Sequence, residues 1–294
     1  MTRQEALGEL ERRRNNVPST RLGRLRKNPW KLIREHGLRR LGLTLEAKSP
    51  TFWGGRFNSL LPEGVSTMVD RHGYFDLPVS RALLTYVDDT ATVIDIGAHF
   101  GFFSLLSSWL VGAAGRVVAI EAIPSTFNRL TLNIAENAPH ANVSLHQVAA
   151  YSEETELEFN DFGAALSSLN SAFEARGTLV KENDKARKVC VRAVPMDTLL
   201  KTESLDRVDL VKIDAESSES YVLRGMSATI ARHRPKMVVE VSDVRPAEQT
   251  QTGLILEWMR DHDYQPYRWR EGRFQPFVEE SEIGYDNFVF IPRE

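Results

Sequence analysis

The stretch that decides the fold is Val93-Ile94-Asp95-Ile96-Gly97-Ala98-His99-Phe100-Gly101, followed by the apolar run 102–111. A short run rich in Val and Ile is typical of a strand buried on both faces of a parallel sheet. The run 102–111 is apolar nearly all round, as in a helix packed against such a sheet. The glycines permit a tight turn, and a helix N-terminus offers N–H groups to a polar ligand. The stretch therefore predicts a strand, a turn and a helix of a ligand-binding α/β domain.

Outward from this stretch, strand-like runs alternate with helical patterns over residues 91–294. Phe127, Leu130 and Ile134, for example, recur at i, i+3 and i+7. This alternation predicts right-handed βαβ units in a Rossmann-like, doubly wound and mostly parallel sheet. An antiparallel C-terminal strand is expected at 287–291, in a hairpin with 264–267. The strand-like runs are 92–96, 116–120, 143–148, 157–160, 189–194, 208–213, 237–241 and 287–291.

Residues 1–50 read as a basic, helical N-terminal extension. Residues 1–40 hold 12 Lys and Arg against 4 Asp and Glu, whereas the rest of the chain has a net charge of −11. A basic arm suggests an acidic partner, a membrane surface or nucleic acid. Nucleic acid is not expected, because Trp30 is the only aromatic residue among the arginines. The favoured interpretation is amphipathic helices that pack on the acidic body or on a second subunit of a homo-oligomer. The apolar residues concerned are Leu7, Leu10, Leu22, Leu25, Trp30, Ile33, Leu38 and Leu41.

The remaining composition bounds the class of protein. Residues 51–90 are rich in Gly, Pro and aromatics, which predicts loops that form a lid or substrate segment before the catalytic domain at 91–294. No run approaches the roughly 18 apolar residues of a transmembrane helix, and the charged N-terminus does not resemble a signal peptide. Cys190 is the single cysteine, which excludes an intrachain disulfide or a cysteine-based zinc site. A cytoplasmic location is the default expectation.

The spacing of the glycines discriminates between cofactors. A dinucleotide fingerprint requires Gly at three places, which here hold Gly97, His99 and Phe102. The pattern Asp-x-Gly-x-x-x-Gly resembles the first motif of class I methyltransferases instead. Glu121, at the end of the second strand, is placed to accept hydrogen bonds from a ribose diol. Taken with Asp95 and Gly97, Glu121 indicates an adenosine-type ligand.

A second set of polar residues follows the strand-like run 208–213. Lys212, Asp214 and Glu216 are flanked by apolar residues at a strand end. Ionisable groups in such a place are costly unless they have partners or a function. Glu219 is consistent with an acid that complements a helix N-terminus. Asp214 and Glu216 are therefore the candidates for catalytic carboxylates, with Lys212 able to orient them.

Taken in order, these motifs resemble the FkbM family of methyltransferases over about residues 50–294. The family usually has Gly where Ser217 stands and Pro where Ala122 stands. The resemblance implies S-adenosylmethionine as cofactor, and methylation of a hydroxyl on a sugar, polyketide or related metabolite in natural-product or glycan biosynthesis. The segments that carry it are VIDIGAHFGFFSLL, VVAIEAIPSTFNRLTLN, HQVAAYSEETELEF, VPMDTLL, DLVKIDAESSESYVLRGM and PKMVVEV.

The resemblance also implies the cofactor contacts. The expected cofactor-binding residues are Asp95, Gly97, Ala98, His99 and Gly101 around the methionine part, Glu121 at the ribose, the adjacent Ala122, and Val148, Ala149 and Ala150 beside the adenine.

Methyl transfer to a hydroxyl is an in-line displacement that benefits from a base within hydrogen-bond reach. Asp214 and Glu216 are the first candidates, and His72 and Glu240 are weaker ones. A hard cation held by Asp214, Glu216 and Glu219 is an alternative, but no metal ligand is assigned. Two other functions stay open: an NAD(P)-dependent oxidoreductase, and a Rossmann subunit that binds without catalysis, for which Ser217 is the only indication.

Overall fold

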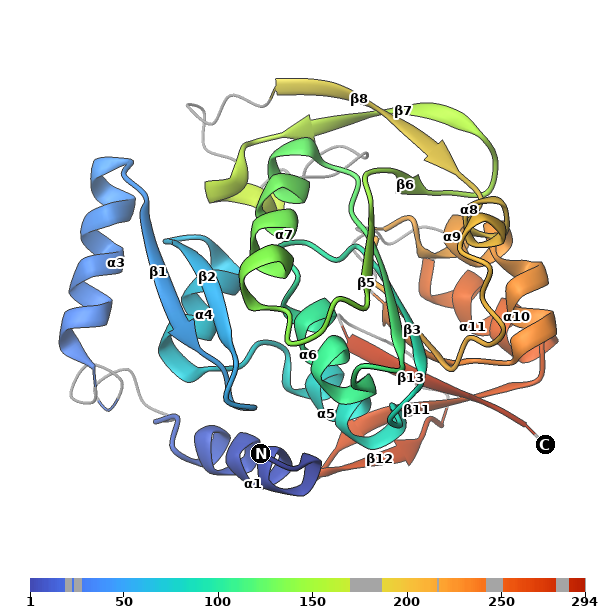
Figure 1. Cartoon of the computed structure of the whole chain (residues 1–294), viewed down its shortest axis with the longest axis horizontal. Coiled ribbons are helices and arrows are strands. Elements are labelled where there is room, and N and C mark those ends of the chain that lie inside the picture. Colours follow the sequence, from blue (N-terminus) through green and yellow to red (C-terminus); the bar gives the residue numbers. More distant parts are fainter. Residues whose placement is uncertain are drawn as a thin grey trace.

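A computed structural model of the chain describes residues 1–18, 23, 28–169, 187–215, 217–241, 251–278 and 286–293. Within these residues the central sheet has eight strands in the order β12-β11-β13-β10-β9-β3-β4-β5 (Figure 1). From β5 to β10 the neighbours are parallel, and β13 and β12 run antiparallel to the rest. The strands are β3 (Thr92–Ile96), β4 (Arg116–Ile120), β5 (Val143–His146), β9 (Leu210–Ile213), β10 (Lys236–Val241), β11 (Tyr264–Arg270), β12 (Arg273–Pro276) and β13 (Asp286–Pro292).

This arrangement confirms the predicted doubly wound, mostly parallel sheet with its antiparallel C-terminal strand. The predicted hairpin partners, 264–267 and 287–291, pair as β11 and β13. Helices cover both faces of the sheet. They are α5 (Leu77–Tyr86), α6 (Phe102–Val111) and α7 (Pro124–Asn137) on one face, and α8 (Met196–Thr202), α9 (Glu219–Gly225), α10 (Ser227–His233) and α11 (Gln251–Asp261) on the other.

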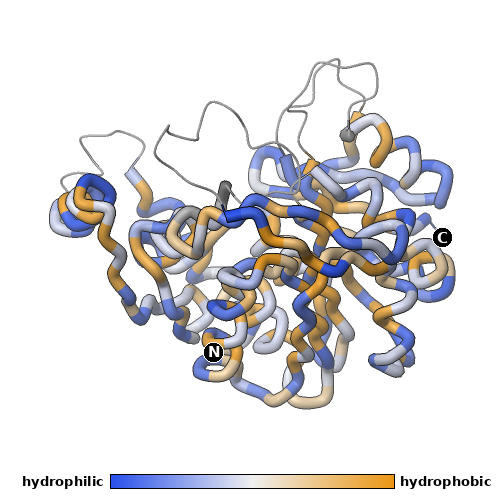
Figure 2. The backbone as a smooth tube through the Cα atoms, turned by 90° about the horizontal axis from the view of Figure 1, so that it is seen from above, coloured by the Kyte–Doolittle hydropathy of each residue, from blue (hydrophilic) through white to orange (hydrophobic). Residues whose placement is uncertain are grey.

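Burial on both faces explains why the strands have no polar alternation. Val93 and Leu210 pack in the core beneath α5 and α6, whereas Ile94 and Val211 pack in the core beneath α8 to α11. Both cores consist of side chains removed from water, which is the main driving force for the fold. Figure 2 shows the apolar strands passing through the middle of the molecule.

Two predicted strands lie outside the central sheet. Residues 157–160 and 189–194 fall in β7 (Thr155–Asp161) and β8 (Arg187–Val194), which pair antiparallel beside β6 (Ala149–Ala150) in a separate three-stranded sheet. Side chains on β7 alternate between partly buried and exposed near its start, as expected for a strand with one face open to solvent. The prediction of strands was right, and their place in the fold is set by long-range pairing.

Residues 51–90 are more regular than expected. The prediction of loops with little regular structure is wrong, because this segment contains β2 (Arg56–Leu61), α4 (Gly64–His72) and α5, and β2 pairs with β1 (Leu45–Pro50). The Gly and Pro residues mark the ends of short elements: Gly73, with φ 75°, ends α4, and Asp76 caps α5 by accepting from the Val79 N–H at 3.1 Å. Edge-on ring contacts of Trp53 and Phe57 with Phe102 attach the segment to α6.

The N-terminal extension contains the predicted helices, α1 (Arg3–Asn15) and α3 (Pro29–Leu41). Helix α1 behaves as expected, since it buries Ala6 and Leu10 and contacts α5. Helix α3 does not bury an apolar side as predicted, because Trp30, Ile33 and Leu41 are exposed. Leu22 and Leu25 lie outside the described residues. Among the helices that the structure describes, none has the length and apolar character of a membrane-spanning segment.

Candidate functional site

A cavity of about 310 Å³ opens at the carboxyl ends of β3, β4 and β9. The strand order reverses between β3 and β9, and such switch points are where open α/β sheets bind ligands. We call this the edge cavity. The predicted site residues that line it are Gly97, Ala98, His99, Glu121, Ala122, Val148, Ala149, Ala150, Lys212, Asp214 and Glu240.

The turn after β3 brings the chain against the end of β9. Gly97 has φ 70°, and a Cβ added to it would lie 1.7 Å from the carbonyl oxygen of Asp214. A Cβ on Gly101 would lie 2.7 Å from Cδ1 of Leu130 on α7. Gly97 is therefore required by its contact with the Asp214 backbone, whereas Gly101 is favoured by its φ of 87°. A larger residue at Gly97 would therefore disturb the fold before it affected a ligand. Gly101 does not line the edge cavity.

Asp95 and Lys212 form a buried pair beneath the cavity. They are register partners on β3 and β9, so their side chains lie on the same face of the sheet. Lys212 Nζ lies 3.3 Å from Asp95 Oδ1 and donates to the Gly97 carbonyl at 2.7 Å, while Ser104 donates to Asp95 Oδ2 at 2.6 Å. Asp95 therefore supports the cavity from below and does not line it.

Asp214 is the exposed partner of the same lysine. Its Oδ2 lies 3.5 Å from Lys212 Nζ, and about a third of its side chain is exposed, against 4% for Lys212. Burial disfavours the ammonium of Lys212, but the charges of Asp214 and Asp95 outweigh burial and raise the pKa of Lys212 above its ordinary value. Lys212 is thus a permanent cation that cannot accept a proton, whereas Asp214 presents a carboxylate to the cavity.

Glu121 is a buried carboxylate held at the end of β4. Its Oε2 accepts from the His99 N–H and its Oε1 from the Ile123 N–H, both at 2.9 Å. Burial raises the pKa of Glu121, and these backbone donors oppose that rise. Each carboxylate oxygen can accept more than one hydrogen bond, so Glu121 retains capacity for two ligand hydroxyls.

His99 adds a polar atom that has no partner among the described residues. With φ 53°, it lies at the start of the turn, and its Nε2 is 2.7 Å from Ser167 Oγ. Nδ1 is buried without a hydrogen bond in the described part of the chain. A buried polar atom of this kind is costly unless a ligand or water completes it.

The loop after β9 has a turn that depends on Ser217. Ser217 has φ 75°, the conformation that favours glycine, so the serine keeps the turn that a Gly would form. The N–H groups of Ala215 and Ser217 donate to Glu219 Oε1 at 2.9 and 3.2 Å. Glu219 thus closes the turn at the start of α9. The predicted catalytic residue Glu216 lies outside the described residues.

The structure separates His72 from the other candidates. His72 lines a different cavity, of about 280 Å³, between α1, α3 and α4. This location removes the geometric basis for His72 as a base at the edge cavity.

Sequence reasoning expected a lid or substrate segment at residues 51–90 but did not identify which of its residues lie at the site. Val65 and Phe75 line the edge cavity, and Asp76 follows Phe75. Asp76 accepts from Asn287 Nδ2 at 2.7 Å. Burial raises the pKa of Asp76 to about 6, and the negative charge of Asp214 adds to the rise. The sequence Asp76-Leu77-Pro78, an Asp followed closely by Pro, could have indicated a helix start with Asp76 as its cap. Nothing local places that carboxylate beside β9.

The residues of the cavity fit the cofactor that the resemblance implies. Glu121 supplies acceptors for a ribose diol, and the apolar wall of Ile123, Val148 and Ala149 suits a flat purine. The carboxylates of Asp214 and Glu240 suit the positive charge of a sulfonium. The unpartnered Nδ1 of His99 leaves a place for one polar group of a ligand.

Comparisons with known proteins agree with this geometry. The family described as Methyltransferase FkbM domain matches residues 95–266, more than half of the chain. The chain is 25% identical over 178 residues to hexuronic acid methyltransferase AglP of Haloferax volcanii, covering 60% of this chain and 65% of that protein. It is 28% identical over 203 residues to AMB antimetabolite synthetase AmbE of Pseudomonas aeruginosa, covering 60% of this chain and 10% of that protein. The chain thus spans less than two thirds of either relative.

A solved structure of methyltransferase FkbM from Methylobacillus flagellatus is 16% identical, covers 76% of this chain and 52% of that one, and has a TM-score of 0.45. The match to the family domain begins at Asp95, near the end of β3, and takes in the following turn, β4, β9 and β10, so it includes the carboxyl edge that forms the cavity. The chain belongs to the FkbM methyltransferase domain family, whose cofactor is S-adenosylmethionine.

Proposed function

We propose that the protein transfers the methyl group of S-adenosylmethionine to a hydroxyl of a sugar, polyketide or related metabolite. The observation that carries this proposal is the carboxylate of Asp214, which faces the edge cavity 3.5 Å from the buried ammonium of Lys212. A carboxylate held at the mouth of a cofactor cavity suits the acceptance of a proton from an incoming hydroxyl.

The cofactor would be held by residues at the ends of three successive strand units. Glu121 would accept hydrogen bonds from the ribose hydroxyls, and Val148, Ala149 and Ala150 would lie against the adenine. The turn Gly97–His99 would lie beside the methionine part. Asp95 supports that turn from below through Lys212.

When bound, S-adenosylmethionine supplies an electrophilic methyl group on a sulfonium. The chain orients the acceptor, excludes water and receives a proton. Asp214 accepts that proton, and Lys212, which stays protonated, holds the Asp214 carboxylate in place by charge. Lys212 is therefore a positioning residue rather than a base.

Asp76 and Glu216 are the further candidates for the proton acceptor. Asp76 is fixed by Asn287 and lies within the electrostatic influence of Asp214. Its pKa of about 6 is closer to neutral pH than an ordinary aspartate's, which favours proton acceptance from an alcohol. Glu216 is also a candidate proton acceptor, because it directly follows Ala215, a residue that lines the cavity.

The relative from Haloferax volcanii is named for a hexuronic acid, a polyhydroxylated acceptor, which supports a sugar or sugar-like acceptor here. Val65 and Phe75 support the assignment of residues 51–90 to the acceptor side of the cavity. Family membership argues against the NAD(P)-dependent oxidoreductase. The turn retained at Ser217 removes the only indication of a non-catalytic subunit. We place the reaction in the cytoplasm, as expected for a chain with a single cysteine.

The test begins with calorimetry of S-adenosylhomocysteine binding, followed by its formation from S-adenosylmethionine with hexuronic acids and neutral hexoses as acceptors. With the best acceptor, Asp214→Asn should lower turnover by about 10²-fold and leave cofactor affinity within about two-fold. His72→Gln, in the other cavity, is the matched control and should retain normal turnover.

Near-normal turnover of both Asp214→Asn and Glu216→Gln would overturn the assignment of the base and leave Asp76→Asn as the next variant. Cofactor binding without turnover on any acceptor of these classes would contradict the proposed acceptors.

A further inference from the structure

Helix α3 faces the body with an ion-paired side and leaves three of its apolar residues exposed. Glu35 is 2% exposed, whereas Trp30 is 79%, Ile33 is 57% and Leu41 is 70% exposed. The three apolar residues are spaced i, i+3 and i+11, which places them on one stripe of a helix with 3.6 residues per turn. A helix that packs on a globular protein normally has the opposite arrangement. The exposed stripe therefore needs its own explanation.

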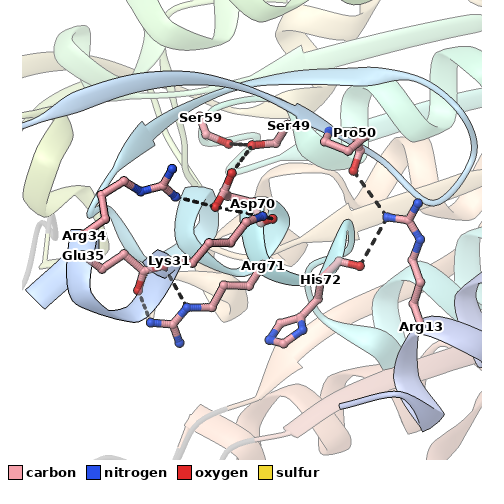
Figure 3. A network of polar contacts seen from close by, with 10 residues as sticks. All are labelled: Arg13, Lys31, Arg34, Glu35, Ser49, Pro50, Ser59, Asp70, Arg71 and His72. Atoms are coloured by element: carbon pink, nitrogen blue, oxygen red, sulfur yellow. Dashed lines mark hydrogen bonds and ion pairs between the residues drawn. The ribbon is translucent and has the colours of Figure 1, made fainter. Parts of the chain in front are cut away.

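A network of ion pairs fixes the helix in this orientation (Figure 3). Lys31 Nζ and Arg34 Nη2 lie 3.3 and 2.7 Å from Oδ2 of Asp70 on α4. Glu35 accepts from Arg71 Nε at 2.8 Å and from a second nitrogen of the same guanidinium. Because these contacts occupy the charged side of α3, they leave Trp30, Ile33 and Leu41 on the side that faces away from the body.

Two further exposed apolar residues follow the helix in sequence. They are Leu43, between α3 and β1, and Leu45, the first residue of β1. We call these five residues the apolar ridge: Trp30, Ile33, Leu41, Leu43 and Leu45. In Figures 1 and 2, α3 lies at one end of the molecule, away from the central sheet.

The charge around the ridge discriminates between partners. Arg39 and Arg40 are exposed at the end of α3, beside Leu41. In a symmetric dimer through the ridge, the exposed arginines of the two copies would be brought close together and repel. An exposed apolar stripe with Trp and flanking Arg has the character of an interfacial helix, and basic residues are attracted to anionic lipids.

We propose that the apolar ridge binds an anionic membrane surface. Trp30, Ile33 and Leu41 enter the boundary between headgroups and acyl chains, and Arg39 and Arg40 contact the lipid phosphates. The ion pairs beneath α3 hold the ridge outward before binding, so little ordering is needed when the protein docks. The carboxyl edge of the sheet would then work on acceptors presented at, or delivered to, that surface.

The experiment is co-sedimentation of the full chain with vesicles of phosphatidylcholine alone and of phosphatidylcholine with one quarter phosphatidylglycerol. The wild type should bind the anionic vesicles and not the neutral ones, and raised salt should weaken binding. The triple variant Trp30→Ser, Ile33→Ser, Leu41→Ser should partition at least ten-fold less. Val278→Ser, which removes an equally exposed apolar side chain elsewhere (78%), is the control and should bind as the wild type does.

A second variant, Arg40→Glu, keeps the ridge intact and should weaken binding several-fold through charge alone. Unfolding curves of all variants should match the wild type, since the substituted side chains are exposed. Equal binding to both vesicle types, no binding, or no effect of the triple variant would overturn the proposal. A concentration-dependent dimer that the triple variant abolishes, without vesicle binding, would assign the ridge to a second copy instead.

Discussion

The protein contains two clusters of ion pairs that differ in depth. At the carboxyl edge of the sheet, Lys212 and Asp95 are enclosed, with side-chain exposures of 4% and 1%. Beneath α3, Asp70 is 9% exposed, but its partners Arg34 and Lys31 are 32% and 34% exposed. In the first cluster neither charge can be hydrated, so each depends on the other. In the second, the cations keep contact with water whether or not Asp70 is present.

The two clusters therefore have different structural roles. The enclosed pair lies within the core and connects the ends of β3 and β9, where Lys212 also donates to the Gly97 carbonyl. The half-exposed cluster only sets the rotation of a surface helix, and in doing so it leaves apolar residues in water. Burial, more than the identity of the charged residues, decides how much stability is lost when one partner of an ion pair is removed.

The largest effect is expected for Lys212→Met. Removal of the cation leaves the Asp95 carboxylate buried, with the Ser104 hydroxyl as its remaining hydrogen-bond donor among the described residues, and breaking a buried pair costs about 3–5 kcal/mol. Urea unfolding at neutral pH measures this loss. The double variant Lys212→Met, Asp95→Asn should recover part of it, because the uncompensated charge is gone. A single variant within about 1 kcal/mol of the wild type would show that the pair is not enclosed in solution.

An intermediate effect is expected from Glu219, a buried acid that depends on backbone donors. Burial raises the pKa of Glu219 to about 7, from an ordinary value of 4.5. The folded protein thus binds a proton that the unfolded chain has already released, and this contribution to stability falls as pH rises from about 4.5 to 7. Over this pH range the free energy of unfolding falls by about 3 kcal/mol through Glu219.

Glu219→Gln removes that titration, so its unfolding free energy should change less than the wild type's between pH 4.5 and 7. Urea unfolding at several pH values provides the comparison. Glu158→Gln, on the exposed β7–β8 sheet, is the control and should leave the slope unchanged. Parallel pH profiles of Glu219→Gln and the wild type would contradict the raised pKa.

The smallest effect is expected for Asp70→Asn beneath α3. The two cations that lose their partner remain hydrated, so the cost should be about 1 kcal/mol, the upper end for exposed ion pairs. High salt should reduce the difference between Asp70→Asn and the wild type, while the cost of Lys212→Met should persist. A salt-independent loss of several kcal/mol would mean that the two clusters are equivalent.

Much of the fold was predictable because its strands are buried on both faces. Continuous Val and Ile runs such as 92–96 and 116–120 do not depend on their neighbours to be recognised, and the structure has them as β3 and β4 with the same bounds. Acids at strand ends, Glu121 and Asp214, could be placed at one cavity because parallel strands end at the same edge. Residues 51–90 were wrongly predicted as loops, because Gly and Pro occur at the ends of short helices as well as in loops.

The sequence by itself determined the doubly wound sheet and indicated the carboxyl edge as the candidate site, because periodicity and strand-end chemistry are local properties. The family resemblance of its motifs indicated the cofactor class. Only the tertiary structure decided that Asp76 lies near Asp214, that His72 belongs to another cavity, and that α3 turns its apolar stripe outward. Each of these depends on contacts between segments far apart in the chain, such as Asp76 with Asn287 and Arg34 with Asp70. Hydrophobic patterning alone predicts which helix faces are apolar, but the partners of the charged side decide which face turns inward.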